Sequence, residues 1–253
     1  MWIVRDALVL TWRNLIRYRR LPQLIIFSTI QPVMFVLLFN YVFGGAIRLP
    51  PGVVSYTSFL LPGILVQAVL FGATQTTVGL AADLSTGMID RFRSLPMTRS
   101  AVLLGRTLAD ATRNVFVVCL MVAVGYLIGF RFENGFLNGL AGIALVVGFG
   151  FTFSWISALL GLIAKSAEAA QAAGFIWIFP LVFASAVFVP VQSMPAWLQT
   201  FAKHQPITYT ANAVRALMLG GSTADVWYAL LWMAGILVVF VPLSVLQYRR
   251  TAR

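Results

Sequence analysis

The stretch 136-FLNGLAGIALVVGFGFTFSWISALLGLIA-164 carries no charged side chain. It exceeds the roughly 20 residues that an α-helix needs to cross a bilayer. Five further apolar stretches lie on either side of it, at residues 24–43, 59–82, 103–130, 169–189 and 227–246. Each has a similar length, so the sequence predicts an all-α integral membrane protein with six transmembrane helices.

The composition agrees with this prediction. Of the 253 residues, 60% are hydrophobic and only 10% are charged, which is too little polar surface for a soluble domain. The length suits one transmembrane domain, residues 1–253, without a second globular domain. The net charge of +11 is not interpreted as nucleic-acid binding, because the arginines flank the apolar stretches as topology signals do.

The distribution of lysine and arginine predicts the orientation. With six spans, 14 of these residues fall on one side: Arg5, Arg13, Arg17, Arg19, Arg20, Arg91, Arg93, Arg99, Arg106, Arg113, Lys165, Arg249, Arg250 and Arg253. The other four, Arg48, Arg131, Lys203 and Arg215, fall on the opposite side. The positive-inside rule therefore predicts a multi-pass protein of the cell membrane with both termini in the cytoplasm.

Residues 2–21 are predicted to form an amphipathic helix in the membrane interface. The following residues share its polar face: Asp6, Arg13, Arg17 and Arg20. The opposite face carries Val4, Leu8, Trp12 and Leu15. Two interpretations remain open: the helix anchors the chain among lipids, or it also contacts a cytoplasmic partner.

Before the last span, residues 195–219 contain two short amphipathic runs that begin at Pro195 and Pro206. Each is too short to cross the bilayer. We expect two short re-entrant helices at the outer leaflet, the second ending at Gly220 and Gly221. The alternative is a surface loop anchored by Trp197 and Tyr209.

The residues of most catalytic or metal sites are missing. The chain has one histidine, His204, one cysteine, Cys119, and no phosphate-binding glycine-rich loop, so we expect no catalytic residue, metal site or disulfide. Asp83 and Asp110 are assigned to cytoplasmic helix ends, and the polar turn with Arg106, Asp110 and Arg113 is expected to pair on one face and to project beyond the hydrocarbon core.

No ionisable relay is therefore expected near the bilayer centre, where a proton- or sodium-coupled transporter normally needs one. The chain has no evident energy source of its own. Either transport through it is passive, or another protein drives it.

The connector 87-GMIDRFRSLPMTRS-100 separates two apolar stretches and is predicted to lie on the cytoplasmic side. A short helix is predicted within residues 86–96, and it should end near Ser94 because Leu95 precedes Pro96. A stiff, two-faced helix suits a groove on a partner. An interfacial loop that serves only topology is the equally weighted alternative.

Two segments resemble a known family. The run 87-GMIDRFRSLPMTRSAVLLGR-106 and the run 188-FVPVQSMPAWLQTFAKHQPITYTANAVRALMLGG-221 are similar to ABC-2 transporter permeases, especially those of the daunorubicin-resistance type. The resemblance covers essentially the whole chain. One departure is Thr86, since many relatives carry an acidic residue directly before the glycine at position 87.

The resemblance implies the membrane half of an ATP-driven exporter rather than an enzyme. In this family two permeases pair, as a homodimer or as a heterodimer with a paralogue, among membrane lipids, and each docks a cytoplasmic ABC ATPase subunit. ATP and Mg bind to that subunit, and the permease itself binds no cofactor.

The contact with the ATPase would be the coupling helix, 86–96, with Gly87, Met88, Asp90, Arg91, Phe92, Arg93, Ser94, Leu95 and Pro96. The interfacial helix would add a second contact, with Trp12, Arg13, Arg17 and Arg20. The short outer helices would close the top of the substrate path.

Candidate residues of a substrate path lie in the second and fifth stretches: Gln67, Phe71, Thr74, Gln75, Phe183 and Phe188. Ordinary helix packing is the alternative for each of them. Such a lining suits a bulky amphipathic drug, a lipid or a lipid-like natural product. Export of a polysaccharide or glycolipid, and a passive channel or membrane scaffold, are the rival functions.

Overall fold

A computed structural model of the chain describes residues 2–20, 22–44, 55–88 and 99–251, and these are helices and connecting turns without a strand. The elements are α1 (Trp2–Arg20), α2 (Pro22–Leu38), the π-helical η1 (Phe39–Phe43), α3 (Tyr56–Ser85), α5 (Arg99–Leu127), α6 (Phe136–Ile163), α7 (Ala167–Phe183), the 3-10 turn η2 (Val191–Ser193), α8 (Ala196–His204), α9 (Pro206–Leu219) and α10 (Ala224–Thr251).

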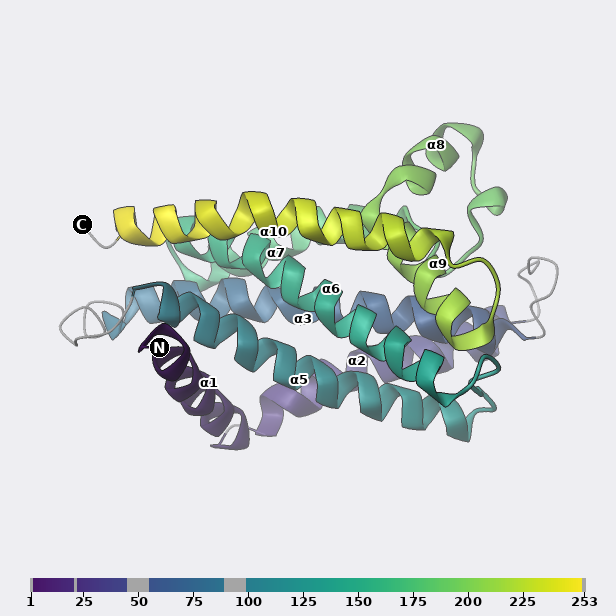
Figure 1. Ribbon diagram of the computed structural model, residues 1–253, viewed down its shortest axis with the longest axis horizontal. Coiled ribbons are helices and arrows are strands. Elements are labelled where there is room, and N and C mark those ends of the chain that lie inside the picture. The colour runs from purple at the N-terminus through teal and green to yellow at the C-terminus, as the bar shows by residue number, and fades with distance from the viewer. Residues whose placement is uncertain (1, 21, 45–54, 89–98, 252–253) are drawn as a thin grey trace.

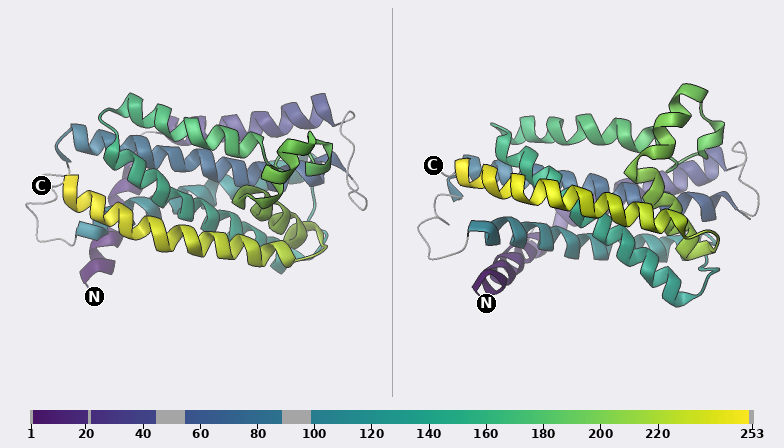
Figure 2. Two further views of the ribbon diagram at one scale, coloured as in Figure 1. Left: turned by 90° about the horizontal axis from the view of Figure 1, so that it is seen from above. Right: turned by 45° about the horizontal axis from the view of Figure 1, so that its top comes forward.

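The long helices form one bundle. Figure 1 shows α2, α3, α5, α6, α7 and α10 running along the long axis of the molecule, while α1 lies obliquely at the end where both termini are found. Figure 2 shows α8 and α9 at the opposite end. We call these the terminal end and the far end of the bundle.

Several helices have the length and apolarity of membrane spans. Among the described residues, four qualify, namely Tyr56–Ser85, Ser100–Leu127, Phe136–Ile163 and Ala224–Arg250. Two shorter apolar helices cover Ser28–Val42 and Ala167–Phe183. An all-helical architecture of this kind is that of an integral membrane protein, because helices satisfy their own backbone hydrogen bonds in lipid.

The centre of the bundle is α3. Its apolar middle is entirely buried, and it packs against α2, α5, α6, α7 and α9. Ser55 begins the helix, since its Oγ accepts a hydrogen bond from the Ser58 amide at 3.1 Å. By contrast, α10 is mostly exposed, with Trp227 and Tyr228 at its far end, where aromatic side chains favour a membrane interface.

The two short helices at the far end differ from each other. Trp197 and Phe201 on α8 are exposed, whereas α9 enters the bundle and buries side chains such as Ile207, Val214 and Met218. Gly220, with φ 95°, ends α9 as predicted. The amides of Glu133 and Asn134, in the α5–α6 turn, donate to the Met218 carbonyl oxygen at 3.0 and 3.3 Å and so cap this helix end. The two short helices therefore occupy different positions, α8 at the surface and α9 within the bundle.

Candidate functional site

Aromatic side chains connect α7 with α3 and with η1 along one side of the bundle. The ring centroids of consecutive pairs are close: Phe175–Phe71 5.7 Å, Phe71–Phe179 5.6 Å, Phe179–Phe183 4.9 Å, Phe183–Phe188 5.2 Å and Phe188–Phe39 4.6 Å. We call these six residues the aromatic row. Three of them, Phe71, Phe183 and Phe188, were path candidates in the sequence. Phe179 and Phe183 are 45% and 43% exposed, so the row also forms part of the surface.

A cavity of about 210 Å³ lies at the start of the aromatic row, between α2, α3 and α7. Its lining residues are Ser28, Gln31, Pro32, Ala68, Phe71, Gly72, Thr74, Gln75 and Phe175. The structure thus brings together three path candidates, Phe71, Thr74 and Gln75. Aromatic walls with a few polar groups are the usual composition of a site for an amphipathic small molecule.

Gln67 is the path candidate that the structure keeps apart from this cavity. It is buried, it is not among the lining residues, and its Oε1 has no hydrogen-bond partner in the described part of the chain. It lies one helical turn before Phe71 on α3, on the same face. Its role is therefore not defined by the cavity.

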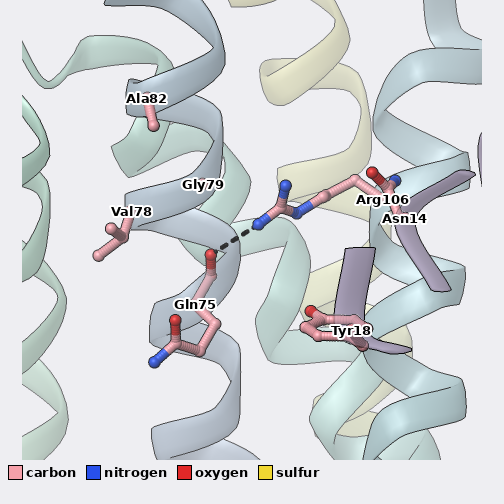
Figure 3. Close-up of a pocket in the computed structure, with 7 residues that line it drawn as sticks. All are labelled: Asn14, Tyr18, Gln75, Val78, Gly79, Ala82 and Arg106. Carbon is pink, nitrogen blue, oxygen red and sulfur yellow. Dashed lines mark hydrogen bonds between the residues drawn. The ribbon is translucent and has the colours of Figure 1, made fainter. Parts of the chain in front are cut away.

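A second group of residues joins α1, α3 and α5. We call Tyr18, Thr76, Asp83, Arg106 and Asp110 the Arg106 cluster. Arg106 lies between two carboxylates, with Nη1 3.6 Å from Asp83 Oδ2 and Nε 3.8 Å from Asp110 Oδ2. Its Nη2 also donates to the Gln75 carbonyl oxygen at 3.0 Å (Figure 3). The predicted pairing of Arg106 with Asp110 is confirmed.

Asp110 is the shared acceptor of the cluster and is fully buried. The Tyr18 hydroxyl donates to its Oδ1 at 2.5 Å, and the Thr76 hydroxyl donates to its Oδ2. Burial raises the pKa of the Tyr18 phenol above its ordinary value, and Asp110 raises it further. Tyr18 therefore stays protonated and keeps donating to the carboxylate.

This polar turn is buried among the helices of the bundle, and its predicted position beyond the hydrocarbon core stays a prediction. Arg106, Asp110 and Arg113 are 7%, 0% and 4% exposed. The guanidinium of Arg106 occupies the space that the missing side chain of Gly79 leaves on α3, since a Cβ there would lie 1.6 Å from Nη2. Arg113 does not join the ion pairs but donates to the Gly72 carbonyl oxygen at 2.8 Å.

The Arg106 cluster borders a small cavity of about 120 Å³. Figure 3 shows its lining residues on α1, α3 and α5: Asn14, Tyr18, Gln75, Val78, Gly79, Ala82 and Arg106. Sequence reasoning missed Tyr18 and Thr76 here. The available signal was Asp110 itself, because a carboxylate within an apolar stretch needs hydrogen-bond donors from other helices.

The N-terminal helix has three faces rather than two. Trp12, which is 67% exposed, and Leu8 point away from the bundle, and Arg20 is exposed while Arg13 is half-buried. A third face with Ala7, Leu10, Thr11 and Tyr18 is buried, and it packs along α5. The Thr11 hydroxyl donates to the Gly105 carbonyl oxygen at 3.2 Å. The side chain of Arg17 lies outside the described part.

The predicted coupling segment falls mostly outside the described residues. α3 ends at Ser85, Gly87 has a φ of 66° and Met88 is half-buried, whereas Asp90, Arg91, Phe92, Arg93, Ser94, Leu95 and Pro96 are not described. The chain resumes in α5 at Arg99. The segment thus connects the two helices that carry Asp83 and Arg106. Within the described ranges, no three His, Cys, Asp or Glu side chains gather as they would around a metal.

Known proteins resemble this chain along most of its length. Residues 5–219 match the model of the ABC-2 type transporter family. The chain is 36% identical to the daunorubicin resistance ABC transporter permease protein of Streptomyces coeruleorubidus, across 97% of this chain and 87% of that protein. It is 30% identical to the probable doxorubicin resistance ABC transporter permease protein of Mycobacterium tuberculosis, across 98% and 90%.

These matches confirm the resemblance noted in the sequence. They extend over both motif regions and over the residues that form the aromatic row and the Arg106 cluster. Together with the apolar helices, they identify a multi-pass membrane protein. The chain belongs to the ABC-2 type transporter family and resembles the permeases of drug-resistance ABC transporters.

Proposed function

We propose that this chain is the membrane-spanning permease subunit of an ATP-driven exporter. In this proposal it crosses the membrane six times with both termini in the cytoplasm, and it pairs with a second permease copy or a paralogue. The helices α2 and α7 supply the two shorter spans. The clustering of lysine and arginine near the terminal end of the bundle supports this orientation.

The energy comes from a separate cytoplasmic ATPase subunit, which binds ATP and Mg. Residues 86–96 are its main contact and α1 is its second contact. The Arg106 cluster supports this arrangement, because Asp110 on α5 receives hydrogen bonds from Tyr18 on α1 and Thr76 on α3. A displacement of α1 or of the segment between α3 and α5 therefore acts on the same group of side chains.

The substrate is a hydrophobic or amphipathic molecule such as a drug, a lipid or a lipid-like natural product. The observation that carries this proposal is the aromatic row, which continues from a cavity with polar groups toward the far end of the bundle. Planar apolar molecules stack on such rings. The names of the relatives, which refer to daunorubicin and doxorubicin resistance, support a planar aromatic compound as the first candidate to test.

The proposal is tested by reconstitution in proteoliposomes with the ABC ATPase encoded nearest to this chain. We expect ATP hydrolysis that planar amphipathic compounds stimulate, together with ATP-dependent accumulation of the compound. The permease without the ATPase is the control. Full-rate transport by the purified chain in the absence of any ATPase and nucleotide would contradict the proposal.

A further inference from the structure

The chain between α7 and η2 is buried without being helical. α7 ends at Phe183, although the apolar stretch continues to residue 189. Residues 185–188 are at most 5% exposed. Their backbone groups are thus withdrawn from solvent and from helical hydrogen bonding, and each needs another partner.

One partner lies within the segment, since the Val187 amide donates to Ser185 Oγ at 3.3 Å. Side chains from outside the segment supply further partners. Arg215 on α9 donates through Nη2 to the carbonyl oxygens of Ala186 and Val187, at 2.6 and 3.0 Å. Three more bonds hold the segment, namely Tyr56 Oη to the Phe188 carbonyl oxygen at 2.9 Å, the Gln205 amide to the Ala184 carbonyl oxygen, and the Ala186 amide to Thr208 Oγ1 at 3.1 Å. The carbonyl groups of the broken helix therefore converge on α3 and α9.

The remaining contacts of Arg215 are also uncharged. Nε donates to the Phe59 carbonyl oxygen at 2.7 Å, the guanidinium carbon lies 3.7 Å from the centre of the Phe59 ring, and Nη1 donates to Asn212 Oδ1 at 3.1 Å. In the described part of the chain, Arg215 makes no ion pair. Carbonyl groups of an unwound membrane helix commonly coordinate a cation, and here a guanidinium of the protein takes that position.

The segment also carries a residue of the aromatic row. The ring of Phe188 stacks between those of Phe183 and Phe39, at 5.2 and 4.6 Å. Arg215 binds the carbonyl groups of the two residues before Phe188, and Tyr56 binds the carbonyl group of Phe188 itself. Together they fix where this ring lies. Gly63 makes room for the arrangement, since a Cβ there would lie 2.3 Å from the Val187 carbonyl oxygen.

We propose that Arg215 is the positioning residue of an outer gate: its guanidinium holds residues 184–190 so that Phe188 stays stacked between Phe183 and Phe39 and closes the path at the far end of the bundle. The gate opens when α9 shifts and the carbonyl groups of residues 184–190 exchange their present hydrogen-bond donors for others. This inference rests on the proposed function for the direction of transport. The bonding of the segment itself does not depend on the ATPase or on a substrate.

The test measures how accessible the segment is. Ala186, which is 3% exposed and takes part in the hydrogen bonds of the segment only through its backbone, is replaced by Ala186→Cys in a Cys119→Ser background, because Cys119 is an exposed free thiol. The full-length protein is placed in lipid nanodiscs, where both faces meet solvent, and is treated with an anionic methanethiosulfonate reagent. Labelling is compared with and without Arg215→Ala.

We expect slow labelling with Arg215 present and labelling about tenfold faster with Arg215→Ala, which corresponds to ~1.4 kcal/mol in the opening equilibrium. Guanidinium ions in the buffer should slow the labelling of Arg215→Ala again, and sodium ions should not. Arg131→Ala is the matched control. Arg131 also donates to two carbonyl groups near the far end, those of Tyr126 and Phe130, but outside the segment, and its removal should leave labelling unchanged.

Equal labelling rates with and without Arg215 would overturn the inference, as would acceleration that guanidinium does not reverse. If Arg215→Ala does not accumulate, Arg215→Lys gives the same test, because an ammonium group keeps the charge but lacks the fork that reaches several carbonyl groups. In the complex with the ATPase, both Arg215→Lys and Phe188→Ala should raise the ratio of ATP hydrolysis measured without substrate to ATP-dependent export. If the chain binds no ATPase, the proposed function is refuted. The labelling experiment tests the role of Arg215 independently of that result.

Discussion

Two arginines are buried at opposite ends of the bundle, and their charges are stabilised in different ways. Arg106 lies between the carboxylates of Asp83 and Asp110. Arg215 lies among backbone carbonyl groups and an aromatic ring, with no carboxylate partner among the described residues. The first joins three helices through side chains, whereas the second holds a stretch of chain that is not helical. Removing an ion-pair partner of Arg106 should therefore leave an unbalanced charge in the Arg106 cluster. Removing a contact of Arg215 should instead change the backbone geometry of the non-helical stretch that it holds.

The largest effect is expected at Asp110. Asp110→Asn leaves the buried Arg106 with only one carboxylate, and breaking a buried ion pair in this way costs about 3–5 kcal/mol. We expect a large fall in the midpoint temperature of unfolding in detergent. The triple variant Asp110→Asn with Arg106→Gln and Asp83→Asn removes all three charges of the cluster and should recover most of the loss. A triple variant as unstable as the single one would show that charge is not the cause.

The next effect concerns the ATPase contact that is proposed beside the Arg106 cluster. Phe92→Ala with Arg91→Glu removes an apolar anchor and reverses a charge, and a central interface residue commonly contributes ~2 kcal/mol or more. Co-purification of the ATPase and ATP-dependent export should both be lost, while the permease stays folded. Unchanged co-purification would rule out residues 86–96 as the coupling helix. The same experiment on Lys203→Glu, at the far end, is the control.

Two tyrosines allow a matched comparison of the two ends. Tyr18 donates to a carboxylate and Tyr56 donates to a backbone carbonyl oxygen, and both are buried. Hydrogen bonds to charged groups contribute about 1.5–3 kcal/mol and neutral ones about 0.5–1.5 kcal/mol. Tyr18→Phe should therefore reduce thermal stability more than Tyr56→Phe. The reverse order would mean that the backbone contacts, rather than the charges, dominate stability.

The smallest differences are expected at two glycines. A Cβ on Gly79 would lie 1.6 Å from the Arg106 guanidinium, and a Cβ on Gly63 would lie 2.3 Å from the backbone oxygen of Val187. A side chain can move and a backbone segment held by four residues cannot, so Gly63→Ala should cost ~1–3 kcal/mol through overpacking. Gly79→Ala should cost less despite the closer approach. Gly235→Ala, where a Cβ meets nothing within 4 Å, is the control in the same thermal assay.

The two ends also differ in how far the sequence predicts them. The pairing of Arg106 with Asp110 follows from their spacing of four residues on one helix. The hydrogen bonds and ion pairs that link these two residues to α1 and α3 do not follow from local spacing, because Tyr18, for example, lies 92 positions away from Asp110. The all-helical architecture was readily predicted, since long apolar runs have few other structures available in a bilayer.

The far end was harder to predict for a physical reason. The run from Ala184 to Val189 is as apolar as the helix before it, so its periodicity gives no sign that α7 stops at Phe183. The break depends on donors from distant positions, namely Tyr56, Gln205 and Arg215. An arginine, Arg215, within a short amphipathic run was an available signal. Of the path candidates, Phe71, Phe183 and Phe188 belong to the aromatic row because large apolar side chains pack together; their place in a substrate path stays a prediction.

The complete enclosure of α3 has a consequence for biogenesis. This helix carries Gln67, Thr74, Thr76 and Thr77 along its buried length, and its partners α6, α7 and α9 are synthesised after it. Until those partners arrive, these polar groups would face acyl chains. We expect α3 to remain beside the insertion machinery until the second half of the chain has left the ribosome, so truncation after α5 should yield a nascent product that proteases remove.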